Sequence, residues 1–475
     1  MQGHGLTKLV VSFFPWVQSG GKLEIHVPRK FSRSRPPVHF SHVDCSDTSI
    51  DSHPLGSQLP HPTGPTPSIH EGCQAFRGFA VPDNLPNDIK HYWDTDQPLL
   101  CLHVTSFVDA TLVGFTFPHS LSDAMGTSGL LRAWSSVVAA KSCNVRPPQG
   151  TWEDALAGVG TGSDKVSLGR FVLEGQQTRR LALASFIGRY VWDVATRRSI
   201  QTRHMYLPAK FVRHLRREVE AELRRSGGGG DGGGGGNDCG EVPFVSDGDV
   251  ILAWGSRMVM DSPSWKGCSA VICNVFDLRG RLEGVFAKAE AGGSGGPFLQ
   301  NLILPATTLL TRGEASTATV GQIAVALRQA IANQTSDEQA RRLMRVAREW
   351  FASMGMMPLF ARWDSRVIAC TNWSRARLLE AAEVGPAAVV NGRDPSSRDA
   401  SASAGAVGPG RPGRPGGPAR PGRPVMYWGT TLSKTDSPRD TFVIYGKDFG
   451  GNYWVHGYLR QETWDLIRRE LERFS

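Results

Sequence analysis

The 475-residue sequence lacks several features that mark special classes of protein. It has no run of about 18 apolar residues, so no membrane-spanning helix is predicted. Its 8 cysteines are scattered without a CxxC pair or a ligand-like Cys/His spacing. We therefore predict neither a metal site nor a disulfide framework, and we expect reduced thiols in a cytoplasmic protein. No stripe of lysine and arginine interleaves with aromatic residues, so no nucleic-acid groove is predicted.

Two segments near the start of the chain could be taken for a signal peptide and a metal-binding region, but we predict neither. Leu9 to Val17 is similar to the apolar part of a signal peptide, but Pro15 interrupts it and no clean cleavage site follows. We favour a buried helix end there. Histidines at positions 39, 42, 53, 61 and 70 lie in a Pro- and Ser-rich region. Their spacing fits no ligand pattern, so we expect them to be exposed to solvent.

The composition that is present, 40% hydrophobic and 20% charged residues, is typical of a folded protein. The length predicts two domains, which we place at residues 1–200 and 201–475. A Gly-rich segment at about 226–240 and a Gly/Pro/Arg-rich segment at about 392–424 cannot bury enough apolar surface to order themselves. We expect both to be expanded surface loops. The net charge of +9 is modest once the second segment is set aside, and it favours a ligand bearing several phosphates.

Strands and helices are predicted without strict alternation, which favours mixed sheets of an α/β protein over a doubly wound fold. Residues 100–108 and 111–117 form a predicted hairpin, and a helix capped by Ser122 or Asp123 follows over 123–140. Other helices are predicted at 208–225, 246–260, 319–332, 336–353 and 462–474. Other strands are predicted at 23–27, 270–278, 367–373, 441–446 and 452–459, and a long loop at 44–75.

The segment HSLSDAMG places His119 at the end of the second hairpin strand and Asp123 at the start of the following helix. It contains the only HxxxD pattern in the chain. A histidine titrates near neutrality and can accept a proton from a reacting group. Gly126 lets the helix start pack closely against its surroundings. The alternative is an ordinary strand-end histidine and a helix-capping aspartate, because so short a pattern arises easily by chance.

This corner resembles the BAHD acyltransferases, which have the chloramphenicol-acetyltransferase-like fold. The similarity spans about residue 9 to the C-terminus and is greatest to fungal members of the trichothecene O-acetyltransferase type. It rests on the HxxxD corner and on the order of four later segments, which are DVILAW at 249–254, DLRGR at 277–281, PFLQN at 297–301 and TNW at 371–373.

The resemblance implies two similar domains with the active site at their interface, in a monomer. It implies acyl-CoA as co-substrate, with no permanently bound cofactor, and a small-molecule acceptor from secondary metabolism. His119 would be the general base that takes a proton from the acceptor's hydroxyl or amine. We expect no metal, nucleic acid or membrane to take part.

The resemblance also assigns supporting residues. Asp123 would orient the corner by pairing with Arg279, or alternatively with Arg281. Thr371 would stabilise the oxyanion, while Trp373 and Asn301 would contact substrate. The alternative for Thr371 and Trp373 is an ordinary strand core.

Several departures from the family leave other interpretations open. Ala124 stands where the family often has glycine, and Glu383-Val384-Gly385 replaces most of its Asp-Phe-Gly-Trp-Gly loop. We find no counterpart of the family's first strand and helix ahead of the segment at Leu9. One alternative is therefore a catalytically impaired remnant that acts as a binding protein. Another is a condensation-type enzyme of the same fold, although Pro118 stands where that class usually has a second histidine.

Overall fold

A computed structural model describes residues 29–474 apart from 89, 94, 96, 142–143, 152–153, 197–198, 228–242, 287–294, 386–421, 430 and 433–437. The expected helix end at Leu9 to Val17 and the strand at 23–27 lie outside the described residues. The two low-complexity segments lie almost entirely outside them. No helix in the described ranges is long and apolar enough to span a membrane.

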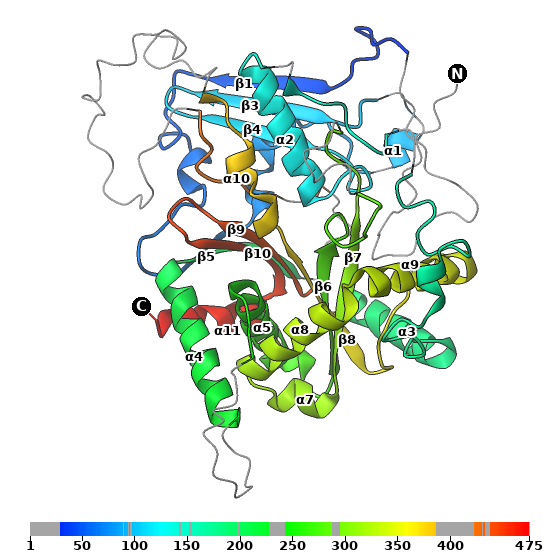
Figure 1. Ribbon diagram of the computed structural model, residues 1–475. Coiled ribbons are helices and arrows are strands. Elements are labelled where there is room, and N and C mark those ends of the chain that lie inside the picture. The colour runs from blue at the N-terminus through cyan, green and yellow to red at the C-terminus, as the bar shows by residue number, and fades with distance from the viewer. Residues whose placement is uncertain are drawn as a thin grey trace, which may run out of the picture.

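Two mixed sheets organise the fold (Figure 1). The small sheet has the order β1-β3-β4, with β1 and β3 parallel and β3 and β4 antiparallel. Its strands are β1 (His39–Cys45), β3 (Cys101–Phe107) and β4 (Thr111–Thr116). The large sheet has the order β2-β5-β10-β9-β8-β6-β7, and only its β9-β8 and β8-β6 pairs are parallel. Its strands are β2 (Ser68–Glu71), β5 (Ile200–Leu207), β10 (Tyr453–Arg460), β9 (Thr441–Lys447), β8 (Ser365–Asn372), β6 (Ser269–Asp277) and β7 (Ile303–Leu310).

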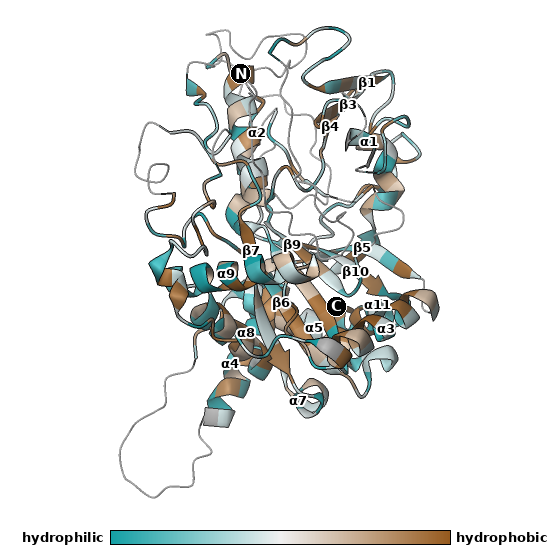
Figure 2. Ribbon diagram, turned by 90° about the vertical axis from the view of Figure 1, so that its right-hand side faces the viewer, coloured by the Kyte–Doolittle hydropathy of each residue, from teal (hydrophilic) through white to brown (hydrophobic). Residues whose placement is uncertain are grey.

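Helices cover one face of the large sheet and form the main core with it (Figure 1). These helices are α4 (Ala209–Gly227), α5 (Asp247–Asp261), α7 (Arg312–Thr317), α8 (Val320–Gln334) and α11 (Gln461–Glu472). Ser246 caps α5 through a reciprocal pair of hydrogen bonds with Asp249, and the helix is buried over most of its length. Figure 2 shows apolar residues concentrated along strands such as β6, while hydrophilic residues mark outer helices such as α9.

The other helices lie beside this core or on the small sheet's side. They are α1 (Lys90–Trp93), α2 (Ala124–Val138), α3 (Arg180–Thr196), α9 (Asp337–Met354) and α10 (Leu378–Ala381). The short 3-10 turns are η1 (Gly56–Gln58), η2 (Cys73–Phe79), η4 (Lys165–Leu168), η5 (Pro263–Trp265) and η6 (Ser374–Ala376). Helix α2 packs against α10 and lies above the large sheet, next to β4 (Figure 1).

The structure confirms mixed sheets but corrects two expectations. The described sheets contain three and seven strands. The expected loop at 44–75 contains β2, which pairs with β5 at the edge of the large sheet. Strands β1, β5 and β7 and helix α3 were not predicted. Pro305 argued against a strand at β7, because proline cannot donate a backbone hydrogen bond. The strand accommodates it because β7 lies at the end of the described sheet order.

The expectation of exposed histidines also fails at His39, His53 and His70, which are all half-buried. The ring of His53 packs against Phe79 and Phe107, with both ring-centroid distances at 5.4 Å. His70 is half-buried on β2, and burial lowers its pKa to about 4. The sequence could not show this, because the residues that pack on these rings come from other elements of the chain.

Candidate active site

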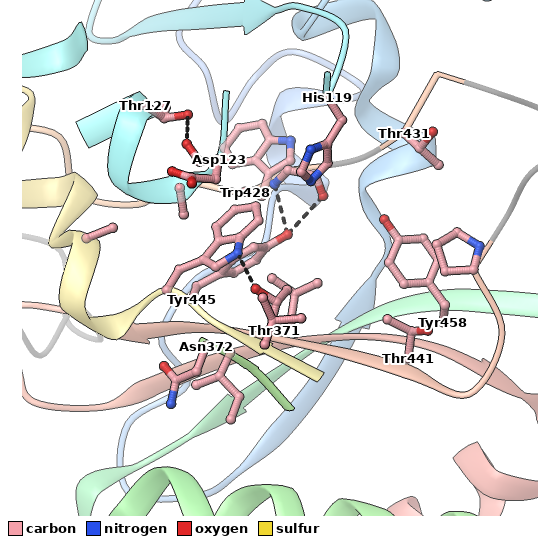
Figure 3. A pocket seen from close by; sticks show the side chains of 18 of the residues that line it. His119, Asp123, Thr127, Thr371, Asn372, Trp428, Thr431, Thr441, Tyr445 and Tyr458 are labelled. Atoms are coloured by element: carbon pink, nitrogen blue, oxygen red, sulfur yellow. Dashed lines mark hydrogen bonds between the residues drawn. The ribbon is translucent and has the colours of Figure 1, made fainter. Parts of the chain in front are cut away.

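A cavity of about 2720 Å³ lies between the β4–α2 corner and the open face of the large sheet. Its lining includes His119 from the corner and Thr371 and Tyr445 from strands β8 and β9. Figure 3 shows His119 on one side of this space and Thr371 on the opposite side. The elements that the resemblance brought together therefore do meet around one cavity.

His119 presents an exposed side chain to this cavity. Strand β4 ends at Thr116, and the amide of Leu121 donates to the carbonyl of Pro118 at 2.8 Å. This turn holds the chain between strand and helix. The side-chain amide of Asn301 donates to the carbonyl of His119 itself. The imidazole thus projects from a backbone that is fixed on both sides.

Asp123 points away from His119 (Figure 3) and has a buried side chain. Its Oδ2 accepts hydrogen bonds from Arg279 Nη1 at 3.0 Å and from the amide of Leu302 at 2.8 Å. Its Oδ1 accepts from the amide of Gly126 at 2.8 Å, which makes Asp123 the N-cap of α2. The structure therefore contains the predicted ion pair with Arg279, rather than the alternative with Arg281.

Arg279 extends this connection beyond the ion pair. Its guanidinium also donates to the carbonyls of Phe298 and Gln300, the latter at 2.6 Å, and pairs with Asp277 at 2.6 Å. The corner of the small sheet is thereby joined to the end of β6 and to the segment that leads into β7. These bonds are charge-assisted, so they are stronger than neutral ones.

Gly126 lies where the first turn of α2 approaches the same segment. A Cβ atom at this position would stand 2.1 Å from the carbonyl oxygen of Leu299 and 2.4 Å from Ser122 Oγ. The first of these is a backbone atom, which cannot rotate away. Only glycine therefore allows the observed approach between α2 and the segment before β7.

Replacing Gly126 with alanine should lower the free energy of unfolding by about 1–3 kcal/mol, because overpacking would force the helix away from Leu299. Urea unfolding of the purified protein measures this. The matched control is Gly188→Ala in α3, where an added Cβ meets no atom within 4 Å. That change should be neutral or stabilising, since alanine is the better helix former. Equal stability of Gly126→Ala and the parent would contradict the close-approach explanation.

Asn301 occupies a different place from the one the resemblance assigned. It is only 5% exposed and does not line the cavity, so it stands behind His119 rather than against a substrate. Its bond to the His119 carbonyl makes it a candidate positioning residue.

Thr371 and Trp373 both line the cavity, as the resemblance implies. Thr371 Oγ1 accepts a hydrogen bond from Trp373 Nε1 at 3.0 Å. The indole also packs against Tyr445, with the ring centroids 5.4 Å apart. Trp373 thus belongs to an aromatic cluster on the open face of the large sheet, and Thr371 is hydrogen-bonded to it. Both residues remain accessible from the cavity.

Sequence reasoning missed an aromatic wall formed by Tyr445 and the segment before β9. The hydroxyl of Tyr445 donates to the carbonyl of Gly429 at 2.9 Å and accepts from its amide at 2.8 Å. Trp428 lies beside His119 in Figure 3. This segment follows a low-complexity stretch and has no periodic pattern. No local signal could have placed it opposite the HxxxD corner.

Arginines form a second group that sequence reasoning missed. Arg281, Arg328 and Arg375 all line the cavity. Burial lowers the pKa of Arg281, the neighbouring cations Arg375 and Arg328 lower it further, and the Asp277 carboxylate opposes them. Arg328 forms an ion pair with Asp249. Three arginine side chains at one cavity are a suitable binding surface for an anionic ligand.

Comparisons with known proteins identify close relatives. No family model matches the chain. The chain is 63% identical over 464 residues to acetyltransferase BOT5 of Botryotinia fuckeliana, an alignment that covers 96% of this chain and 80% of that protein. It is 32% identical over 462 residues to acetyltransferase pyiB of Pyricularia grisea, covering 96% and 83%.

A solved structure has a similar fold. A crystal structure of F. sporotrichioides TRI101, complexed with coenzyme A and T-2, aligns over 99% of this chain and 86% of its own, with a TM-score of 0.50 and 13% identity. The relatives' names favour an acyltransferase over the condensation-type and non-catalytic alternatives. With the HxxxD corner, the shared fold and the similarity to acetyltransferases, the chain belongs to the BAHD-type acyl-CoA-dependent acyltransferases.

Proposed function

We propose that this enzyme moves an acetyl group from acetyl-CoA to a hydroxyl or amine of a small secondary-metabolite acceptor, with His119 as the general base. The observation that carries the proposal is the accessible imidazole of His119 at a cavity wall, on a backbone held by Asn301. The acetyltransferase relatives support the acyl group. The coenzyme A and T-2 in the TRI101 structure support the two substrate classes.

The chemistry requires one base and no covalent enzyme intermediate, because a thioester is already activated. His119 accepts the acceptor's proton as its oxygen or nitrogen attacks the thioester carbonyl. The tetrahedral intermediate then collapses, the carbon–sulfur bond breaks, and the imidazolium returns the proton to the departing thiolate. Asp123 takes no part in proton transfer, since it faces Arg279.

Thr371 is our candidate for stabilising the oxyanion of that intermediate. The indole nitrogen of Trp373 can only donate, so Thr371 Oγ1 is the acceptor in their hydrogen bond. The hydroxyl hydrogen is then available to another acceptor. A bond from Trp373 thus orients Thr371 without consuming the hydrogen that the oxyanion needs.

Thr371→Val should lower kcat by about 10²–10³-fold, the usual cost of removing one oxyanion donor. Steady-state release of free thiol from acetyl-CoA in the presence of an acceptor measures this. Thr371→Ser is the matched control, because it keeps the hydroxyl, and it should retain most of the activity. Full activity of the valine variant would assign Thr371 to the strand core alone.

The arginine group supports the binding of coenzyme A. Its phosphates would meet positive potential from Arg281, Arg328 and Arg375 at the cavity. Arginine pairs with phosphate through bidentate, charge-assisted hydrogen bonds. We also place the reaction in the cytoplasm, a proposal supported by the six cysteines of the described residues, all of which are free thiols.

The direct test is incubation of the purified protein with acetyl-CoA and a panel of hydroxylated and amine-bearing small molecules. Free thiol and a product heavier by one acetyl group are the readouts. Acceptor-dependent release of both is expected. The proposal fails if no acceptor raises thiol release above the buffer rate while isothermal titration shows that coenzyme A does not bind.

A further inference from the structure

A second group of chemically active side chains lies on the same face of the large sheet as Thr371. The register aligns Thr371, Val443, His456, His204 and His70 in one row across strands β8, β9, β10, β5 and β2. Directly paired residues point to the same face of a sheet. This row therefore places two buried histidines, His456 and His204, side by side on the cavity face.

Cys73 reaches the same point from η2. The preceding residue, Gly72, makes this possible, because a Cβ there would stand 2.1 Å from the carbonyl oxygen of Thr202 on β5. Cys73 Sγ lies 2.8 Å from His204 Nε2 and 3.9 Å from His456 Nδ1. The three donor atoms all lie within 4.8 Å of one another.

These distances fit a single metal ion. Zinc bonds of about 2.3 Å to sulfur and about 2.0–2.1 Å to nitrogen place tetrahedral ligand atoms roughly 3.3–3.6 Å apart. The two sulfur–nitrogen distances of 2.8 and 3.9 Å bracket that range. Binding would lengthen the shorter of these separations by about 0.7–0.8 Å and shorten the longer one by about 0.3–0.4 Å. The hydroxyl of Tyr445, 3.9 Å from Cys73 Sγ, and the Gly429 carbonyl, 2.8 Å away, stand nearest to a fourth position.

The surroundings favour a bound ion over three isolated polar groups. Cys73, His204 and His456 are all 0% exposed. The nitrogens that face Cys73 Sγ are His204 Nε2 and His456 Nδ1, so both imidazoles direct one ligand atom to the same point. On binding, the Cys73 thiol gives up its proton and both imidazoles bind in their neutral form.

The donor set selects the kind of metal. One thiolate and two imidazoles form a borderline-soft set that suits zinc, while magnesium, calcium and manganese prefer oxygen ligands. Structural zinc sites are closed and four-coordinate, and here the Gly429 carbonyl or the Tyr445 hydroxyl would fill the fourth position beside the three buried side chains. We propose that Cys73, His204 and His456 form a structural zinc site that fastens η2 and the Trp428–Gly429 segment to the large sheet.

This site would stiffen one wall of the cavity. It lies two strand spacings, about 10 Å, from Thr371 along the row. Gly429 and Tyr445, which touch both the cluster and the cavity, connect the two. The ion itself would bond to protein groups alone, so acyl transfer would not proceed through it.

The test uses tag-free, full-length protein produced in zinc-supplemented medium and analysed by mass spectrometry for metals. About one zinc per chain is expected in the parent and a marked loss in Cys73→Ala. Cys101→Ala is the matched control, since Cys101 is a buried cysteine on β3 away from the cluster, and it should keep the zinc. The melting temperature should rise with added zinc in the parent and in Cys101→Ala only.

X-ray absorption of the zinc-loaded parent tests the ligands without relying on a variant that folds. One sulfur and two imidazole nitrogens are expected. A parent that binds no zinc, a Cys73→Ala variant that binds it equally, or a shell without sulfur would each overturn the site. Metal content and acyl transfer are separate readouts, so failure here leaves the proposed activity intact.

Discussion

His119→Ala should lower kcat/KM for acetyl transfer by about 10²–10⁴-fold, the range that a positioned general base contributes. The substitution should lower the rate of acetyl transfer and leave the stability of the fold unchanged. The imidazole is exposed in the cavity, and the contact that holds this residue goes to its backbone carbonyl. The melting temperature of the variant should therefore stay close to that of the parent.

Thiol release with an acceptor that the parent acetylates measures this effect, and a thermal melt on the same sample measures stability. His214→Ala is the matched control, because that histidine lies on the solvent side of α4 and pairs with Glu218. It should change neither quantity. If His119→Ala releases coenzyme A as fast as the parent, the general-base assignment is wrong.

Asp123→Ala should have the opposite profile and destabilise the fold by about 3–5 kcal/mol. The side chain is 4% exposed, and its loss leaves the Arg279 guanidinium without this buried partner. The amides of Leu302 and Gly126 would also lose their acceptor. Activity would then fall because the corner that aims His119 no longer keeps its shape.

Urea unfolding gives the free-energy change, with Glu380→Ala as the control. Glu380 forms an exposed ion pair with Arg377 at 3.5 Å, so its removal should cost about 1 kcal/mol or less. Asp123→Asn keeps the shape but removes the charge, and it should be destabilised less than the alanine variant. An unchanged melting temperature in Asp123→Asn would count against the structural role of this carboxylate.

The HxxxD corner could be predicted from the sequence because its information is local. Residues 101–107 alternate between buried and half-buried positions, and the following helix begins at a capping aspartate. Both patterns are visible within a few turns of chain. The Asp123–Arg279 pair joins residues 156 positions apart. Only the resemblance to a family could suggest it, and the spacing alone left Arg281 equally possible.

The remaining parts of the site depend on contacts that no local pattern encodes. The resemblance could assign Asn301 to the site. It could not show that Asn301 lies behind His119 and not against a substrate, because that depends on how the segment before β7 packs. Strand β5 mixes polar and apolar residues without a clear pattern, so it was not predicted. This strand carries His204. Cys73 meets that histidine and His456 across separations of 131 and 383 residues, so no ligand spacing could reveal the cluster.

Strand β2 has a consequence for how the chain acquires its structure. It is made early in synthesis, but its partner β5 pairs in turn with β10 near the C-terminus. Loop-closure entropy opposes such distant pairing until most of the chain is present, and folds rich in distant contacts form slowly. The first 200 residues would thus leave the ribosome with an edge strand that has no sheet to join. Such exposed strands favour aggregation, so slower elongation or a chaperone that shields β2 should raise the yield of native enzyme.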